Sequence, residues 1–380
     1  MNTPIEIAGA GPAGLAAAIT LAKAGQKVLI HETHNEVGYR FAGDFQGLDN
    51  WTSPKDVLDV FTEQGITTDF IARPCLNGTV FGPTGKRYPI KSKEVLFYLV
   101  ERGPGPGTLD SAMLEQACSL GVEVRFNSRL KKISDRGIMA AGPRAADAIA
   151  VGYHFETNQK DGYWAICDNK LAPYGYAYLL ILNGRGTVKT CMFAEFNQQK
   201  QYLKKTIAAF EHLVGLDMQN PVFHGGSGNF YVPRTAYRGS HPIIGEQAGF
   251  QDTLWGFGMR LAISSGVLAA QSLIMNKNYD KLWQKNLKPQ MDVSVVNRAI
   301  FHLISYHSFD WFLRLVSTRK NLRQTLHSQY HPSLLKHLLS PWAKKHYKSN
   351  RKQTTCDQTN CHCTWCRAEY CVQESLENGT

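Results

Sequence analysis

Apolar and polar positions along the chain fall into three patterns. Residues 5–32 hold two short apolar runs that flank an Ala/Leu-rich stretch, which predicts a βαβ unit. Residues 151–196 alternate aromatic and small side chains, which predicts an antiparallel sheet with one covered face. Beyond residue 281, apolar residues such as Ile300 and Trp311 recur near helical spacing among Lys, Arg and His, which predicts helices as far as residue 350.

The turn inside the predicted βαβ unit is rich in glycine. In such a turn the first glycine permits a tight bend, the second lets a pyrophosphate approach the backbone, and the third lets the helix pack on the strand. Glu32 lies at the tip of the second strand, where a carboxylate can accept hydrogen bonds from ribose hydroxyls. The pattern predicts a dinucleotide site, although the turn alone does not separate FAD from NAD. Its residues are Gly9, Ala10, Gly11, Pro12, Ala13 and Gly14.

Two further segments, together with this turn, resemble the FAD-dependent geranylgeranyl reductases and, more broadly, the aromatic-hydroxylase-type flavoproteins. The first, residues 102–124, reads RGPGPGTLDSAMLEQACSLGVEV. It is similar to the family's arginine, Leu-Asp, helix and Gly-Val-x-Val strand. The resemblance implies that Arg102 lies near the phosphates of FAD; the alternative is a solvated loop arginine before an ordinary amphipathic helix.

The second segment, residues 245–270, looks like the family's Gly-Asp-Ala-Ala-Gly followed by an Asp-Pro-Leu-x-Gly-x-Gly-Ile turn. Glu246 replaces the usual aspartate and Thr253 replaces proline. The resemblance implies that the acid holds the ribityl chain, and that the turn aims N–H groups and a helix dipole at the N1/O2 edge of the flavin. The cofactor residues expected here are Gly245, Glu246, Gly256, Gly258 and Met259.

The resemblance implies an enzyme in which reduced FAD delivers hydride to a carbon–carbon double bond of an isoprenoid. Tyr174, Tyr176 and Tyr178 would line the substrate, although they match the family's Tyr-x-Trp-x-Phe-Pro stretch only in part, and ordinary strand packing is the alternative. The cysteine that many archaeal members carry near residue 45 is missing. The sequence identifies no catalytic residue, and NADPH or an electron-carrier protein would act as a transient reductant.

Two other functions compete with this one. An FAD-dependent monooxygenase or halogenase shares the cofactor. These enzymes usually carry an Asp-Gly motif after the strand before the substrate domain, but residues 138–143 read IMAAGP and lack it. A flavin-bound scaffold or sensor without catalysis is the second alternative, because no catalytic acid or base is identifiable.

These patterns predict an α/β fold in four parts. A Rossmann-like FAD-binding domain is discontinuous, and an antiparallel β-sheet substrate domain is inserted into it. A basic helical region and a Cys-rich tail follow. The expected ranges are 1–75, 99–150 and 235–280 for the FAD-binding domain, 76–98 and 151–234 for the substrate domain, 281–350 for the helices and 351–380 for the tail.

The net charge of +11 is concentrated in one segment. Residues 281–352 hold 14 Lys/Arg against Asp292 and Asp310. With tryptophans nearby, this segment suits an anionic membrane surface, and a solvated basic face is the alternative. We expect no nucleic-acid partner and a cytoplasmic protein, because no secretory signal is visible and Arg260 interrupts the most apolar long window.

Cysteines are also unevenly placed. Cys75, Cys118, Cys167 and Cys191 are scattered and are expected to be reduced core residues. Five thiols crowd into the polar tail, which predicts a bound metal, either zinc or an iron–sulfur cluster, with an unliganded tail as the alternative. The expected ligands are Cys356, Cys361, Cys363, Cys366 and Cys371.

Overall fold

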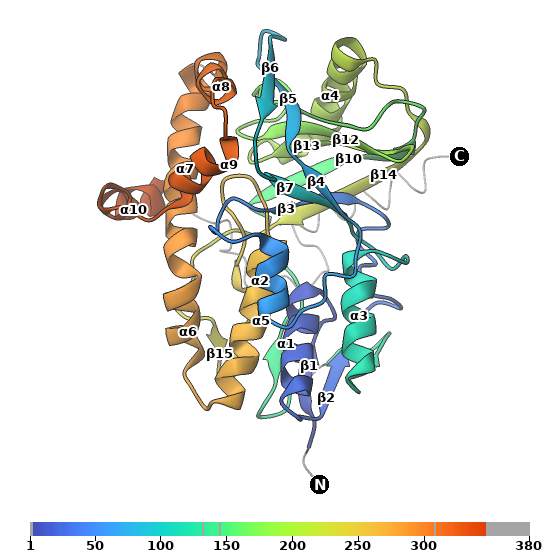
Figure 1. Ribbon diagram of the computed structural model, residues 1–380, viewed down its shortest axis with the longest axis vertical. Coiled ribbons are helices and arrows are strands. Elements are labelled where there is room, and N and C mark those ends of the chain that lie inside the picture. The colour runs from blue at the N-terminus through green and yellow to red at the C-terminus, as the bar shows by residue number, and fades with distance from the viewer. Residues whose placement is uncertain (1–2, 131–132, 144–145, 308, 347–380) are drawn as a thin grey trace.

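The computed structural model describes residues 3–130, 133–143, 146–307 and 309–346. The chain forms a mixed α/β fold in which the half that contains the predicted nucleotide turn lies below a large sheet (Figure 1). We call it the nucleotide-binding half after this prediction. The helix α7 (Lys288–His307) runs along one side of both. The five tail cysteines of the metal prediction lie outside the described residues.

The lower half is built on a parallel sheet in the order β8-β2-β1-β9. Its inner strands pair in parallel, with Ile7 opposite Ile30, as the βαβ pattern predicts. The helices α3 and α5 pack against α1 of this unit, and together they bury an Ala/Leu/Ile core. The elements are β1 (Ile5–Ala8), α1 (Pro12–Lys23), β2 (Val28–His31), α3 (Leu109–Ser119), β8 (Glu123–Arg125), β9 (Ile138–Met139), η2 (Gly245–Ala248) and α5 (Met259–Ile274), with the hairpin β15 (Tyr237–Arg238) and β16 (His241–Pro242) beside them.

A small antiparallel sheet, in the order β3-β7-β4, lies between the two halves. Asp56 caps the helix α2, which follows β3, by accepting a hydrogen bond from the Leu58 N–H. The elements are β3 (Phe45–Asp49), α2 (Val57–Glu63), β4 (Ala72–Cys75) and β7 (Phe97–Glu101).

The upper half is a seven-stranded sheet in the order β14-β10-β13-β12-β11-β5-β6. The sequence predicts an antiparallel sheet, and every pair is antiparallel except β11 with β5. The helix α4 covers one face, and the opposite face looks towards the nucleotide-binding half. The elements are β5 (Asn77–Phe81), β6 (Arg87–Lys91), β10 (Ala148–Glu156), β11 (Gly162–Ile166), β12 (Tyr176–Leu182), β13 (Arg185–Met192), η1 (Phe196–Gln198), α4 (Gln199–Val214) and β14 (Gln219–Gly228).

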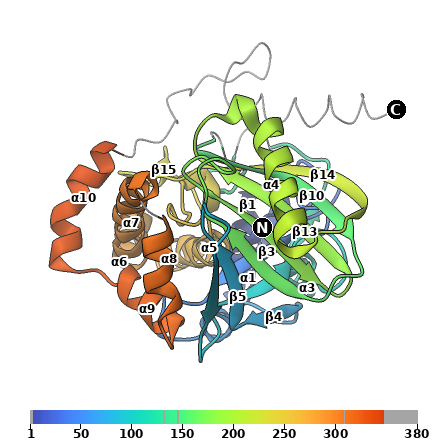
Figure 2. The same cartoon turned by 90° about the horizontal axis from the view of Figure 1, so that it is seen from above.

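The C-terminal helices lie together on one side of the molecule (Figure 2). Two positions with helical spacing, Ile300 and Trp311, are exposed, so this region does not bury all of its apolar residues. In the part of the chain that the structure describes, no helix is long and apolar enough to cross a membrane. The helices are α6 (Tyr279–Asn286), α7 (Lys288–His307), α8 (Phe309–Ser317), α9 (Leu322–Tyr330) and α10 (Leu334–His346).

Candidate functional site

The three glycines of the β1–α1 turn have different surroundings. A Cβ atom on Gly9 would lie 2.3 Å from the Ala140 carbonyl oxygen, and one on Gly14 would lie 2.0 Å from the Gly9 carbonyl oxygen. A Cβ on Gly11 would meet nothing within 4 Å. Gly9 and Gly14 are therefore needed for packing, whereas the backbone at Gly11 faces open space that a pyrophosphate can enter.

The helix N-termini of this fold differ in whether a side chain caps them. Asp56, Thr108 and Asn278 cap α2, α3 and α6 with their own side chains. By contrast, α1, α4, α5 and α9 have neither a side-chain cap nor an acidic residue in the first turn. Of these four helices, α1 and α5 have glycine as the N-cap residue, Gly11 before Pro12 and Gly258 before Met259. The first N–H groups of a helix need acceptors, so these two bare N-termini are suited to the phosphates and the polar flavin edge of FAD.

Close packing holds the helices α1 and α5 together. A Cβ on Gly266 of α5 would lie 2.1 Å from the Ala13 carbonyl oxygen of α1, and a Cβ on Gly245 would lie 2.8 Å from Ala13 Cβ. Gly258 precedes Gly266 by about two turns, or roughly 12 Å along the helix axis. The N-terminus of α5, with Met259 as its first residue, therefore extends beyond that of α1 towards the large sheet (Figure 1).

The predicted acid of the turn lies beside it. Glu32 accepts hydrogen bonds from the Ala10 N–H at 2.7 Å and from the His34 N–H at 3.0 Å. Both bonds fix the carboxylate at the end of β2, next to the glycine turn. Its contact with a ribose stays a prediction.

Arg102 is held by its own neighbours. Its guanidinium forms a two-point ion pair with Asp110, at 2.7 and 2.9 Å, and donates a further bond of 3.1 Å to Gln46 Oε1. It also lies 4.1 Å above the Phe41 ring. Arg102 is thus a buried residue that ties β7 to α3, and its contact with the phosphates stays a prediction.

The two departures from the family pattern have local explanations. Glu246 Oε1 accepts a hydrogen bond from the Asn229 N–H at 3.2 Å, and burial raises the pKa of this carboxyl group. The N–H of Thr253 donates to Ser294 Oγ at 2.7 Å. Proline has no N–H, so threonine at this position allows a hydrogen bond to α7 that the family's usual residue could not form.

The three predicted substrate tyrosines do not lie together. The Tyr176 hydroxyl donates to the Trp255 carbonyl oxygen at 2.5 Å, just before the Gly256 turn, and the Tyr178 ring lies 6.1 Å from that of Tyr176. Tyr174 instead stacks on His302 of α7, with ring centroids 4.1 Å apart. Tyr176 therefore lies beside the Gly256 turn with Tyr178 next to it, whereas Tyr174 packs against the helical region.

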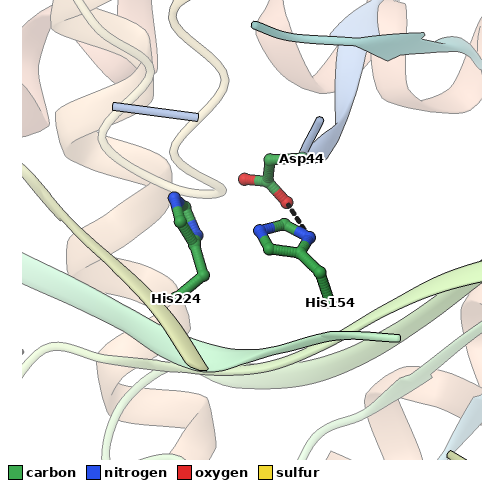
Figure 3. Close-up of side chains that lie close together, drawn as sticks. All are labelled: Asp44, His154 and His224. Carbon is green, nitrogen blue, oxygen red and sulfur yellow. Dashed lines mark ion pairs between the residues drawn. The ribbon is translucent and has the colours of Figure 1, made fainter. Parts of the chain in front are cut away.

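Sequence reasoning missed a buried polar cluster between the two halves. Asp44, from the loop before β3, lies opposite His154 of β10 and His224 of β14, and the side chains point towards one another (Figure 3). Lys189 of β13 donates to Asp44 Oδ2 at 2.5 Å and to His224 Nδ1 at 2.8 Å. The four residues, which we call the Asp44 cluster, link the large sheet to the loop before β3.

Strand alternation places the Asp44 cluster on one face of the sheet. On β10, Val151 and Tyr153 point towards the α4 side, and His154 points to the opposite side. Gly152 lies opposite both Lys189 and His224, and a Cβ there would lie 2.6 Å from Lys189 Cγ. The glycine leaves room for the two side chains to meet across β10.

Burial and the Lys189 charge set the protonation of the Asp44 cluster. Burial raises the pKa of Asp44, but Lys189 and the two imidazoles outweigh this effect, so the pKa lies below its ordinary value. Burial, followed by the Lys189 charge, lowers the pKa of His224. Burial lowers the pKa of His154 to about 4. At neutral pH the cluster is an ammonium–carboxylate pair flanked by two neutral imidazoles.

The ligand atoms of Asp44, His154 and His224 lie within 4.8 Å of one another, as in a metal site. Lys189, however, already places a positive charge in hydrogen-bond contact with two of the three. A divalent cation would have to displace this buried ammonium or lie against it. We therefore do not assign a metal to the Asp44 cluster.

A groove of about 490 Å³ lies elsewhere, between α4 and the outer face of β10 and β14. Tyr153 and Phe223 line it, and they point away from His154 and His224. This groove is on the opposite face of the sheet from the bare helix N-termini, so we do not place the cofactor there.

The scattered cysteines are free thiols in the structure, as expected. Cys75 and Cys167 are buried, Cys191 is half-buried and Cys118 is exposed, so Cys118 is not a core residue. The metal site expected at the five tail cysteines stays a prediction.

Comparisons with known proteins agree with this geometry. Residues 7–46 match the model of the NAD(P)-binding Rossmann-like domain. The chain is 23% identical to a digeranylgeranylglycerophospholipid reductase of Haloferax volcanii, over 82% of this chain and 88% of that protein. A geranylgeranyl bacteriochlorophyll reductase-like structure from Thermoplasma acidophilum superposes with a TM-score of 0.67 at 19% identity, over 90% of this chain and 98% of that one. A flavin-dependent brominase superposes with a TM-score of 0.62 at 14% identity, over 90% and 99%. The two structural likenesses show the fold alone.

Proposed function

We propose that this chain is an FAD-dependent oxidoreductase of the geranylgeranyl-reductase-like kind, the proteins to which it is similar, and that it reduces carbon–carbon double bonds of an isoprenoid or other lipid-like substrate. The observation that carries the cofactor assignment is the pair of bare helix N-termini at Gly11 and Gly258. Gly9, Gly11, Pro12, Ala13 and Gly14 would hold the pyrophosphate and Glu32 the ribose. Gly256, Gly258 and Met259 would meet the flavin.

The substrate assignment rests on the sequence relative and on an apolar cluster beside the sheet. Phe45 and Leu99 of the small sheet pack there with Leu180 and Leu182 of β12. Tyr178 packs against the same cluster, and burial, followed by the charge of Asp44, raises its pKa. In this proposal the prenyl chain lies next to this apolar cluster, so that its reacting carbons are close to the charged Asp44 cluster.

FAD, when reduced, supplies hydride to one carbon of the double bond, and a proton must reach the neighbouring carbon. We assign the supply of this proton to the Asp44 cluster. Lys189 Nζ carries three protons and donates two of them to Asp44 and His224. The Nε2 atom of His224 contacts the Arg40 carbonyl oxygen at 2.7 Å, so a neutral His224 accepts at Nδ1 and donates at Nε2. Asp44 holds the ammonium in place.

The electron donor in this proposal is NADPH or an electron-carrier protein. The Rossmann-like match covers the same turn that would hold FAD. A nicotinamide cofactor would therefore bind only transiently, at another position. Anaerobic addition of NADPH to the purified protein, followed by the flavin absorbance, separates the two donors, because only a nicotinamide-linked enzyme bleaches without a carrier protein.

A single experiment tests the proposed reaction. The FAD-loaded protein is reduced chemically without oxygen and mixed with a detergent-dispersed prenyl lipid, and the product is analysed by mass spectrometry. We expect a gain of two hydrogens per reduced double bond and no product with Gly11→Val protein. Incorporation of oxygen or bromine when air or bromide is supplied would instead favour a monooxygenase or halogenase, the activities of proteins with the same fold. An unchanged lipid would count against the reductase.

We extend the proposal to peripheral contact with a membrane, because prenyl lipids partition into bilayers. The basic segment 281–350 is the surface that the charge distribution favours.

A further inference from the structure

The helix α10 exposes large apolar side chains that a surface helix normally buries. It packs on α7 through Ala343 and Leu339, which contact Val295, Val296 and Ala299. Its leucines Leu334, Leu335 and Leu338 are 86%, 67% and 75% exposed. A surface helix normally buries its large apolar residues and exposes polar ones, so α10 presents an apolar face that nothing in the described part of the chain covers.

This apolar face is continuous along the helix. Leu334, Leu338 and Trp342 follow one another at intervals of four residues, which places them on one side of a helix, and Leu335 lies beside them. We call these four residues the α10 apolar face. In both views α10 lies at the outer edge of the helical region, beyond α7 (Figures 1 and 2). A flat surface can therefore approach it without meeting the body of the molecule.

The charges around the α10 apolar face have one sign. The helix carries Lys336, Lys344 and Lys345 and no Asp or Glu. Lys344 is paired with Asp292 of α7, which also pairs with Lys288. Lys336 donates hydrogen bonds to the carbonyl oxygens of Gln329 and His331. Lys345 is exposed at the C-terminal end of the helix. An apolar face with a basic border is the pattern of helices that lie in the headgroup region of anionic membranes.

We propose that the α10 apolar face inserts into the surface of an anionic bilayer. A second copy of this chain is a poorer partner, because a symmetric contact would bring two basic helices together. The inference deepens the proposed function, since it names the surface on which a lipid substrate is met. The membrane proposal does not depend on the flavin. Vesicle binding without lipid turnover would support the membrane proposal and count against the reductase. Turnover of detergent-dispersed lipid without vesicle binding would support the reductase and count against the membrane proposal.

The test measures co-flotation of the full chain with two kinds of vesicle, pure phosphatidylcholine and phosphatidylcholine mixed with phosphatidylglycerol. We expect binding to the anionic vesicles that weakens at high salt. Leu338→Glu should lower the partition coefficient about tenfold or more, because a buried leucine is lost and a negative charge is added. The matched control is Val222→Glu on β14, a residue that is 60% exposed on the large sheet, and this variant should bind as the native chain does.

Four results would overturn the proposal. The first is equal vesicle binding by the native chain and Leu338→Glu, and the second is equal binding of the native chain to neutral and anionic vesicles. The third is a native dimer that Leu338→Glu converts to a monomer, and the fourth is slow amide exchange in α10 without vesicles that Leu338→Glu abolishes. The third result would assign the face to a second copy, and the fourth to another segment of the same chain. The FAD content of each variant, which should equal that of the native chain, shows that the fold is retained.

Discussion

The nucleotide turn and the Asp44 cluster are built in different ways. At the turn, the groups available to a ligand are main-chain N–H groups at Gly11 and Gly258, and the important feature is that side chains are missing. In the Asp44 cluster, four side chains from separate segments neutralise and orient one another. The first region is determined by local sequence, whereas the second exists only when distant strands pair in the correct register.

This difference predicts different responses to mutation. A main-chain site fails when a side chain is added, and the result depends on where the new atoms point. A side-chain site fails when one member is removed, because the remaining groups stay buried without a partner. The predictions below are ordered by the expected effect on the free energy of unfolding of the apoprotein.

Gly14→Val should have the largest effect. Its Cβ would lie 2.0 Å from the Gly9 carbonyl oxygen, so α1 would have to move away from β1. We expect a loss of more than about 4 kcal/mol, observed as little or no soluble protein. Gly226→Val is the matched control, because a Cβ on this strand residue meets nothing within 4 Å and valine favours strands. Equal soluble yields of the two variants would contradict the packing role of Gly14.

Lys189→Met should destabilise the protein by about 3–5 kcal/mol, because it leaves the buried Asp44 carboxylate without its cation. Urea unfolding at pH 7 measures this loss. The double variant Asp44→Asn/Lys189→Met removes both charges and should recover most of it. If the double variant is as unstable as Lys189→Met alone, the ion pair does not determine the effect.

The features that could be predicted from the sequence are the local ones, whereas those that depend on distant strand pairing could not. The βαβ unit, the glycine turn and Glu32 lie within 28 consecutive residues, and local pattern was sufficient to place them. The pairing of β5 with β11 joins distant segments, and no alternation pattern reveals whether such a pair is parallel. The Arg102–Asp110 ion pair could have been predicted, since both residues lie in the segment 102–124 and are only eight positions apart.

The Asp44 cluster could not be predicted from the sequence, for a physical reason. Asp44 and Lys189 are separated by 145 positions, and their contact depends on the register that sets Gly152 opposite Lys189. The signal that could have been followed was a lysine at an inward position of an otherwise apolar and aromatic strand pattern. A buried lysine requires a partner, but only the fold shows that the partner is Asp44.

The pH dependence of stability tests the neutral histidine of the Asp44 cluster. The pKa of His154 falls to about 4 in the folded chain, whereas that of an unfolded histidine is about 6.5. Between these values the unfolded chain binds a proton that the folded chain does not, so the free energy of unfolding falls as the pH falls. We expect a loss of about 3 kcal/mol from His154 between pH 6.5 and 4. Urea unfolding across this range should show a shallower slope for His154→Gln, and an identical slope would mean that His154 does not carry the effect.

Gly11→Val should have the smallest effect on the apoprotein and yet a complete effect on the cofactor. A Cβ at Gly11 meets no protein atom within 4 Å, so the fold should tolerate valine with a change within about 0.5 kcal/mol. The same side chain would occupy the space beside the bare N-terminus of α1, where the pyrophosphate must approach. We expect a colourless protein with the native apoprotein melting temperature and no release of FAD on denaturation, whereas Gly226→Val should remain yellow. A yellow Gly11→Val protein would place the cofactor away from this turn and would remove the main-chain half of the comparison.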